Sequence, residues 1–257
     1  MVGEIAHGRT SLATRWRVWR HQRRSNRANV HYHYDVSNAF YRLWLDRQLV
    51  YSCAYFPTDG ATLDDAQTAK LEHICRKLRL RPGERFLDIG CGWGALLFVA
   101  AQRYGVDATG ITLSRNQFDY MKGEIAARGL ADRVRVELRD YADLPEDARY
   151  DKIASVGMFE HVGAARFPSY FGKIRRLLAP GGLVLNHGIT HNPLGAHSLG
   201  SGLGDFVEDY VFPGGELVHV SEVIAGMAQQ GLEVIDAEAL REHYAKTLWH
   251  WCERLEA

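Results

Sequence analysis

The chain has little that would anchor it in a membrane or cross-link it. Its 257 residues contain no run of about 18 or more apolar residues, so the sequence predicts no transmembrane helix. The first residues lack the apolar core of a signal peptide, which argues against secretion. The four cysteines are scattered without a CxxC pair, which argues against a zinc site and against a disulfide framework. We therefore expect a cytoplasmic protein without a metal ion.

Negative charge is missing near one end of the chain. No acidic residue stands between Glu4 and Asp35, whereas seven arginines do, together with Trp16 and Trp19. A basic segment with tryptophans suits an anionic membrane, so a peripheral contact with the inner membrane surface is one interpretation. The other is a solvated leader, or the remnant of a preceding domain, over residues 1–30. Nucleic acid is disfavoured as a partner, because no recognition motif accompanies the arginines.

Beyond residue 80 the sequence alternates regularly between apolar strands and helices. Residues 31–80 are expected to form a helical cap, whose second helix, Thr62 to Leu80, ends before Pro82. In the core, 81–257, strands are expected at 86–89, 108–112, 134–138, 151–156 and 183–186. Helices are expected at 95–104, 116–128 and 166–178, with a turn at 180–182 and a mobile, glycine-rich excursion at 191–204. This alternation predicts an α/β domain with a mostly parallel sheet and helices on both faces.

Three glycines at alternate positions follow the first expected strand, in Asp88-Ile89-Gly90-Cys91-Gly92-Trp93-Gly94. Glycines allow the backbone to turn sharply and to approach a ligand closely. A helix is expected to begin at Ala95, and the free N–H groups at its start attract an anionic group. The strand, loop and helix therefore predict a nucleotide-type ligand.

The second expected strand helps to identify that ligand. A dinucleotide site needs an acidic residue at the end of this strand, to hold a ribose hydroxyl. The strand ends in Gly110-Ile111-Thr112-Leu113-Ser114, which lacks a carboxylate. Asp88 suits the ammonium group of S-adenosylmethionine (SAM), and Asp140, after the third strand, suits the adenine amino group, with Tyr141 beside the ring. The residues therefore favour SAM over NAD, with a loop-capping Asp88 as the alternative.

Five segments stand in a distinctive order. They are Tyr51-Ser52-Cys53-Ala54-Tyr55-Phe56, Leu87 to Gly94, Thr112 to Gln117, Phe159-Glu160-His161 and His243 to Leu248. In this combination the chain, over about residues 28–257, resembles the cyclopropane-fatty-acyl-phospholipid synthases and the related mycolic acid cyclopropane synthases. The resemblance implies the Rossmann-like fold of the class I SAM-dependent methyltransferases.

The resemblance also implies a reaction and a set of site residues. These enzymes transfer the SAM methyl group to the cis double bond of a lipid acyl chain, and a cyclopropane ring forms with bicarbonate as the general base. The residues implied to line SAM are Tyr51, Ser52, Asp88, Gly90, Cys91, Gly92, Trp93, Gly94, Thr112, Leu113, Gln117, Asp140 and Tyr141. Those implied to hold bicarbonate are Cys53, Glu160, His187, the backbone of Ile189, and Tyr244.

Sequence position supports part of this set independently. Glu160 follows the fourth expected strand and His187 the fifth, so both lie at the carboxyl edge, where open α/β sheets bind their ligands. A helix-capping Glu160 and a core His187 are the alternatives. Cys53 has no base beside it in the sequence, so a packing or ligand-contact role is expected rather than a nucleophilic one. His161 is expected to point elsewhere and receives no role.

Three functions stay open from the sequence. The first is a lipid-modifying C-methyltransferase that makes a cyclopropane ring, or else a methyl or methylene branch. The others are a small-molecule methyltransferase and a non-catalytic, lipid-binding module. The chain ends soon after the Tyr244 segment, so a C-terminal truncation is expected. An unsaturated phospholipid or another acyl lipid is the expected partner, and homodimer formation is left open.

Overall fold

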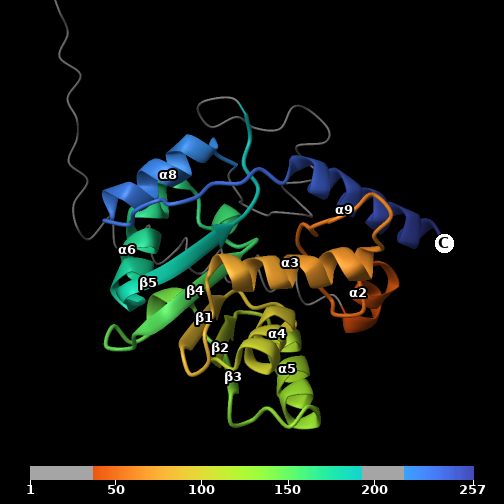
Figure 1. Ribbon diagram of the computed structural model, residues 1–257, viewed down its shortest axis with the longest axis horizontal. Helices are drawn as coiled ribbons and strands as arrows, with labels where there is room; N and C mark the ends of the chain where they lie inside the picture. The colour runs from red at the N-terminus through yellow and green to blue at the C-terminus, as the bar shows by residue number, and fades with distance from the viewer. Residues whose placement is uncertain (1–36, 193–216) are drawn as a thin grey trace, which may run out of the picture.

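The computed structural model describes residues 37–192 and 217–257, so the basic leader and most of the glycine-rich stretch lie outside the described residues. Within these ranges, five parallel strands form a sheet in the order β3-β2-β1-β4-β5 (Figure 1). Their bounds are β1 (Arg85–Ile89), β2 (Asp107–Thr112), β3 (Val134–Leu138), β4 (Tyr150–Val156) and β5 (Leu178–His187). The strand order reverses between β1 and β4, and such a switch point creates a crevice beyond the carboxyl ends of the strands.

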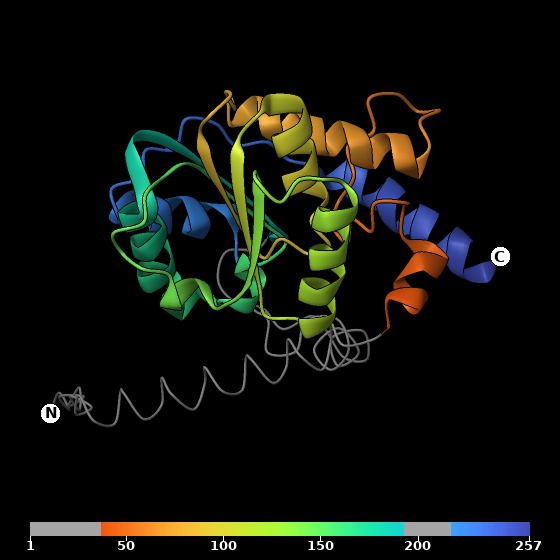
Figure 2. The ribbon, with the colours of Figure 1, turned by 90° about the horizontal axis from the view of Figure 1, so that it is seen from below.

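Helices cover both faces of the sheet, as the sequence predicts (Figures 1 and 2). One face packs against α3 (Leu63–Lys77), α4 (Ala95–Tyr104) and α5 (Arg115–Ala127), and the other against α6 (Phe167–Leu177) and α8 (Val220–Gln229). Neighbouring residues of β1 separate the two layers, because Phe86 belongs to the first core and Leu87 to the second. This is the alternation that a strand imposes on its side chains.

A third apolar cluster joins distant parts of the chain beside the sheet. Helices α2 (Asn38–Trp44) and α9 (Arg241–Glu256) lie side by side there (Figures 1 and 2). The ring centroid of Trp44 lies 5.1 Å from that of Tyr51 and 5.3 Å from that of Trp251. Trp93 of the glycine loop joins this cluster and donates from Nε1 to Asn38 Oδ1 at 2.8 Å. The C-terminal helix is thereby packed close to the loop expected to bind the cofactor.

Two local predictions were wrong. The expected cap is not helical throughout its described part, because residues 45–62 between α2 and α3 form no helix. The Asp46 carboxylate accepts the N–H groups of Gln48 and Val50 at 2.9 and 2.7 Å, so a side chain replaces the helical acceptors. The turn expected at 180–182 is instead part of β5, where Gly181 has a φ of +72° and the pairing with β4 shifts register. The glycine is therefore used for an irregularity within the strand.

Candidate active site

A cavity of about 330 Å³ lies at the carboxyl ends of β1, β2 and β4, within the crevice that the strand order creates. Its wall contains twelve of the thirteen residues that the sequence assigned to SAM. These are Tyr51, Ser52, Asp88, Gly90, Cys91, Gly92, Trp93, Thr112, Leu113, Gln117, Asp140 and Tyr141. The remaining one, Gly94, is the N-cap of α4, and a Cβ there would lie 2.6 Å from Met121 Cε. Gly94 therefore serves helix packing rather than the cavity wall.

The glycine loop forms one wall of the cavity. Gly90 and Gly92 have φ values of +80° and +56°, which other residues rarely adopt. The N–H groups of Gly90 and Cys91 both donate to the Ile111 carbonyl at 3.0 Å, which ties the loop to β2. No side chain caps the start of α4, so the first N–H groups of this helix remain for a ligand.

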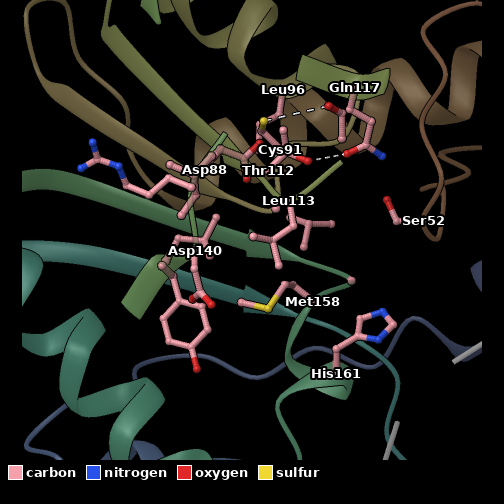
Figure 3. Close-up of a pocket in the computed structure, with 18 of the residues that line it drawn as sticks. Ser52, Asp88, Cys91, Leu96, Thr112, Leu113, Gln117, Asp140, Met158 and His161 are labelled. Carbon is pink, nitrogen blue, oxygen red and sulfur yellow. Dashed lines mark hydrogen bonds between the residues drawn. The ribbon is translucent and has the colours of Figure 1, made fainter. Parts of the chain in front are cut away.

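Polar groups from three elements face the glycine loop. Thr112 Oγ1 donates to Gln117 Oε1 at 2.7 Å, joining the end of β2 to α5 (Figure 3). Asp140 begins a 3₁₀ turn, η1 (Tyr141–Asp143), and its Oδ1 accepts the N–H of Ala142 at 3.0 Å. In Figure 3, Ser52 lies on the opposite side of the cavity from Asp140. Polar groups of the cavity can therefore contact an extended ligand at both of its ends.

Lys70 of α3 lines the cavity, although the sequence-based set does not contain it. Its ammonium donates to Ser52 Oγ at 2.8 Å. The signal was present in the sequence, because Leu63, Gln67, Lys70 and Ile74 follow the helical period and all lie on the buried face of α3. A lysine at such a position is rarely buried without a specific partner.

Burial changes the acidity of two groups on this wall. Desolvation lowers the pKa of Lys70 to about 8, against the opposing effects of Asp46, Cys53 and Asp88. Desolvation raises the pKa of Asp88 to about 7, and the charge of Lys70 opposes that change. Asp88 Oδ1 is buried and has no hydrogen-bond partner among the described residues. A buried carboxylate oxygen without a donor is costly, so this atom is suited to a cationic ligand group.

The five residues expected to hold bicarbonate, Glu160 among them, are absent from the cavity wall. Glu160 contacts one other member of the set directly. It lies in the turn η2 (Phe159–His161), is fully buried, and accepts the Ile189 N–H through Oε1 at 2.6 Å. Gly188 permits this approach, since a Cβ there would lie 2.0 Å from the Phe159 ring. Glu160 Oε2 has no partner among the described residues, and desolvation raises the pKa of Glu160 to about 7.

Tyr244 is an electrostatic neighbour of both Glu160 and Cys53. Burial is the main cause of the raised pKa of Tyr244, and Tyr51, Glu160 and Cys53 add to it. Burial also raises the pKa of Cys53 to about 11, so the thiol stays protonated and is not a nucleophile at neutral pH. Its Sγ lies 3.8 Å from the Leu240 carbonyl, near the start of α9.

His187, at the end of β5, completes the expected set. Its carbonyl accepts the N–H of Gly157, a residue of the cavity wall, at 2.9 Å. Burial lowers the pKa of His187 to about 4, and Lys70 contributes to this shift. The imidazole is therefore neutral at pH 7, and its buried Nδ1 has no partner among the described residues.

The backbone N–H of Ile189 is donated to Glu160, which connects Ile189 directly to this carboxylate. One detail differs from the expectations. His161, which received no role, lines the cavity next to Met158 (Figure 3). Across residues 37–192 and 217–257, no three His, Cys, Asp or Glu side chains gather as metal ligands would.

The parallel sheet, its switch point and the glycine loop define the class I SAM-dependent methyltransferase fold. The chain belongs to the mycolic acid cyclopropane synthetase family, whose family model matches residues 21–257.

Known proteins agree with this assignment. A probable fatty acid methyltransferase of Pseudomonas putida is 51% identical over 236 residues, which cover 92% of this chain and 60% of the relative. The cyclopropane synthase MmaA2 of Mycobacterium tuberculosis superposes with a TM-score of 0.83 at 34% identity, covering 90% of this chain and 83% of that one. Mycolic acid cyclopropane synthase CmaA1, complexed with SAH and CTAB, gives a TM-score of 0.82 at 37% identity, with the same coverage.

Proposed function

We propose that this protein transfers the methyl group of SAM to the cis double bond of an unsaturated phospholipid acyl chain and forms a cyclopropane ring. One observation supports it above all. Besides a cavity that suits SAM, the protein has a second polar set outside the cavity wall, in which the buried atoms Glu160 Oε2 and His187 Nδ1 have no partners among the described residues. A methyltransferase acting on a hydroxyl or an amine would not need such a set.

SAM, when bound, supplies an electrophilic methyl group. The chain's own task is then to orient that group and to keep water away, because water quenches a carbocation. The cluster of Tyr41, Trp44, Tyr51 and Trp93 beside the cavity excludes solvent and presents aromatic faces. Such faces stabilise positive charge.

The second polar set suits a bicarbonate ion. Glu160 Oε2 is an acceptor for the O–H of bicarbonate. Neutral His187 and the Tyr244 hydroxyl are candidate donors to the oxygens of bicarbonate. Ile189 orients Glu160 through its N–H, which leaves the second carboxylate oxygen for the ion. Bicarbonate, when bound, would supply a base that survives beside an alkylating agent.

We also propose that the protein contacts an anionic membrane surface, where its lipid substrate would lie. The arginines of residues 9–27 support this contact by their charge. None of the helices in the described part of the chain is long and apolar enough to cross a membrane. A contact through basic side chains is therefore the proposed mode of attachment.

The proposal is tested by mass spectrometry of acyl chains after incubation of the protein with SAM, bicarbonate and vesicles of a cis-unsaturated anionic phospholipid. Addition of one methylene unit to the unsaturated chains supports the proposal, and fragmentation separates a ring from a methyl or methylene branch. Saturated vesicles and the Glu160→Gln variant are the controls. SAM binding without any change of the acyl chains contradicts lipid methylation.

A further inference from the structure

Lys70 is a buried charged group that the proposed reaction does not use. It is 3% exposed and stands on the inner face of α3, among the apolar residues Leu71 and Ile74. Confining an ammonium in such a place is costly unless it is compensated. The cavity wall, to which Lys70 belongs, is where we expect compensation from a ligand.

The hydrogen bonds of Lys70 leave donor capacity unused. An ammonium has three N–H donors, and its hydrogen bond within the described structure is to Ser52 Oγ. Asp46 and Asp88 act on Lys70 through their charges, without a direct ion pair in the described residues. The Asp46 carboxylate is already used by the N–H groups of Gln48 and Val50. Lys70 therefore has donors to offer in the cavity.

Asp88 provides the complementary charge on the same cavity wall. Its Oδ1 lacks a donor among the described residues, and Asp88 and Lys70 are each only 3% exposed. One wall thus presents a buried cation with spare donors and a buried carboxylate with a spare acceptor. An α-amino acid zwitterion, with an ammonium and a carboxylate on one carbon, matches this pair of charges.

We propose that Lys70, together with the Ser52 hydroxyl, binds the carboxylate of the methionine part of SAM, while Asp88 receives its ammonium group. This inference rests on SAM being the ligand, as proposed above. Lys70 is a binding residue in this assignment, and it fixes which end of SAM lies beside Ser52. The adenine end then points toward Asp140, on the opposite side of the cavity from Ser52 (Figure 3), and toward Tyr141, the next residue of the cavity wall.

A cycle of two ligands and two proteins tests the assignment by calorimetry at pH 7. The ligands are SAM and decarboxylated SAM, which keeps the sulfonium and the amine but lacks the carboxylate. The native protein is expected to prefer SAM by about 10- to 100-fold, the usual value of a hydrogen-bonded charge pair. Lys70→Met is expected to weaken SAM binding and to reduce the preference to about threefold or less, because the coupling between the two groups is lost.

Lys152→Met is the matched control. Lys152 is also a buried lysine, 8% exposed, but it stands on β4 away from the cavity and lies 3.6 Å from Glu84 Oε1. Its variant is expected to be less stable and yet to keep the native preference for SAM. A Lys70→Met protein that binds both ligands more weakly by the same factor, or neither more weakly, overturns the assignment and leaves the proposed function intact.

A structure of the native protein with S-adenosylhomocysteine decides the question if Lys70→Met does not fold. Lys70 Nζ is expected within about 3.2 Å of a carboxylate oxygen of the ligand. A separation beyond about 5 Å overturns the assignment, because no direct charge-assisted hydrogen bond spans it. A native protein that binds neither SAM nor its product contradicts the proposed function itself, and the assignment of Lys70 with it.

Discussion

The backbone N–H of Ala54 donates to Thr247 Oγ1 at 3.0 Å, although the two residues stand 193 positions apart. Thr247 lies on α9, one helical turn beyond Tyr244, and is completely buried. Its hydroxyl donates in turn to the His243 carbonyl at 2.7 Å. This pair of bonds joins the segment that contains Ser52 and Cys53 to the helix that contains Tyr244.

Thr247→Val is expected to destabilise the protein by about 1–3 kcal/mol, because it leaves the buried Ala54 N–H without an acceptor. Urea unfolding measures the change in the free energy of unfolding. Thr247→Ser keeps the hydroxyl and is expected to retain more stability than the valine variant. The reverse order of the two variants would contradict the role of this hydrogen bond.

Two glycine-to-alanine variants are expected to change stability in opposite directions. In Gly110→Ala, the new Cβ on β2 would lie 2.4 Å from Leu97 Cδ1 and 2.9 Å from Cys91 Cβ, which predicts a loss of about 1–3 kcal/mol. In Gly123→Ala, on the exposed side of α5, a Cβ meets no atom within 4 Å. This variant should gain about 0.5–1 kcal/mol from helix propensity. Thermal or urea unfolding compares them, and a stable Gly110→Ala protein would argue against the close packing of β2 on the loop.

The raised pKa of Glu160 makes the native protein less stable as the pH rises. Below its ordinary pKa of 4.5 the carboxyl is protonated in both the folded and the unfolded chain, so its titration does not change the free energy of unfolding. Between that value and about 7 the unfolded chain releases the proton while burial keeps it on the folded one. The loss of unfolding free energy grows over this pH range and is constant above it, at roughly 3 kcal/mol as an upper limit.

Glu160→Gln removes this titration and keeps the shape of the side chain. The difference in unfolding free energy between the native protein and the variant should therefore increase from pH 5 to pH 8, with the variant the more stable at pH 8. The comparison also cancels the titration of Asp88, which both proteins share. A difference that does not depend on pH would show that Glu160 is ionised throughout.

Turnover should depend on the same titration. The proposed role of Glu160 as an acceptor needs its ionised form, so kcat/KM should rise with pH until about pH 7 and then level off. Glu160→Gln should bind SAM normally and lose most turnover over the whole range. Near-normal turnover of this variant would remove Glu160 from the base site.

The basic leader should govern attachment to membranes. Replacement of Arg15, Arg17, Arg20, Arg23 and Arg24 by glutamine should weaken sedimentation with anionic vesicles by at least about tenfold, since each charge near the surface contributes about 1 kcal/mol. The affinity for SAM should not change. Lysine at the same positions keeps the charge and should keep vesicle binding, and equal binding by the glutamine variant would contradict the membrane contact.

Much of the cofactor cavity could be predicted from the sequence because its signals are local. Gly90 and Gly92 follow an apolar strand directly, and the alternation of strands and helices orders the sheet around that loop. The irregular segment 45–62 was missed because the Asp46 side chain accepts the N–H groups of Gln48 and Val50 in place of helical carbonyls, an effect that apolar periodicity does not detect. The role of Gly181 was missed for a related reason, since a glycine before a strand and one within it look alike in sequence.

The sequence by itself determined the α/β class, the cofactor loop and the family, because strand and helix periods and the order of short motifs are properties of the chain. Only the tertiary structure placed Lys70 against Ser52, the Ile189 N–H on Glu160, and Thr247 against Ala54. These contacts join residues 18, 29 and 193 positions apart. Their existence, and the shifted pKa values of Lys70 and Glu160, depend on which surfaces are buried together, and burial is decided by packing of the whole fold.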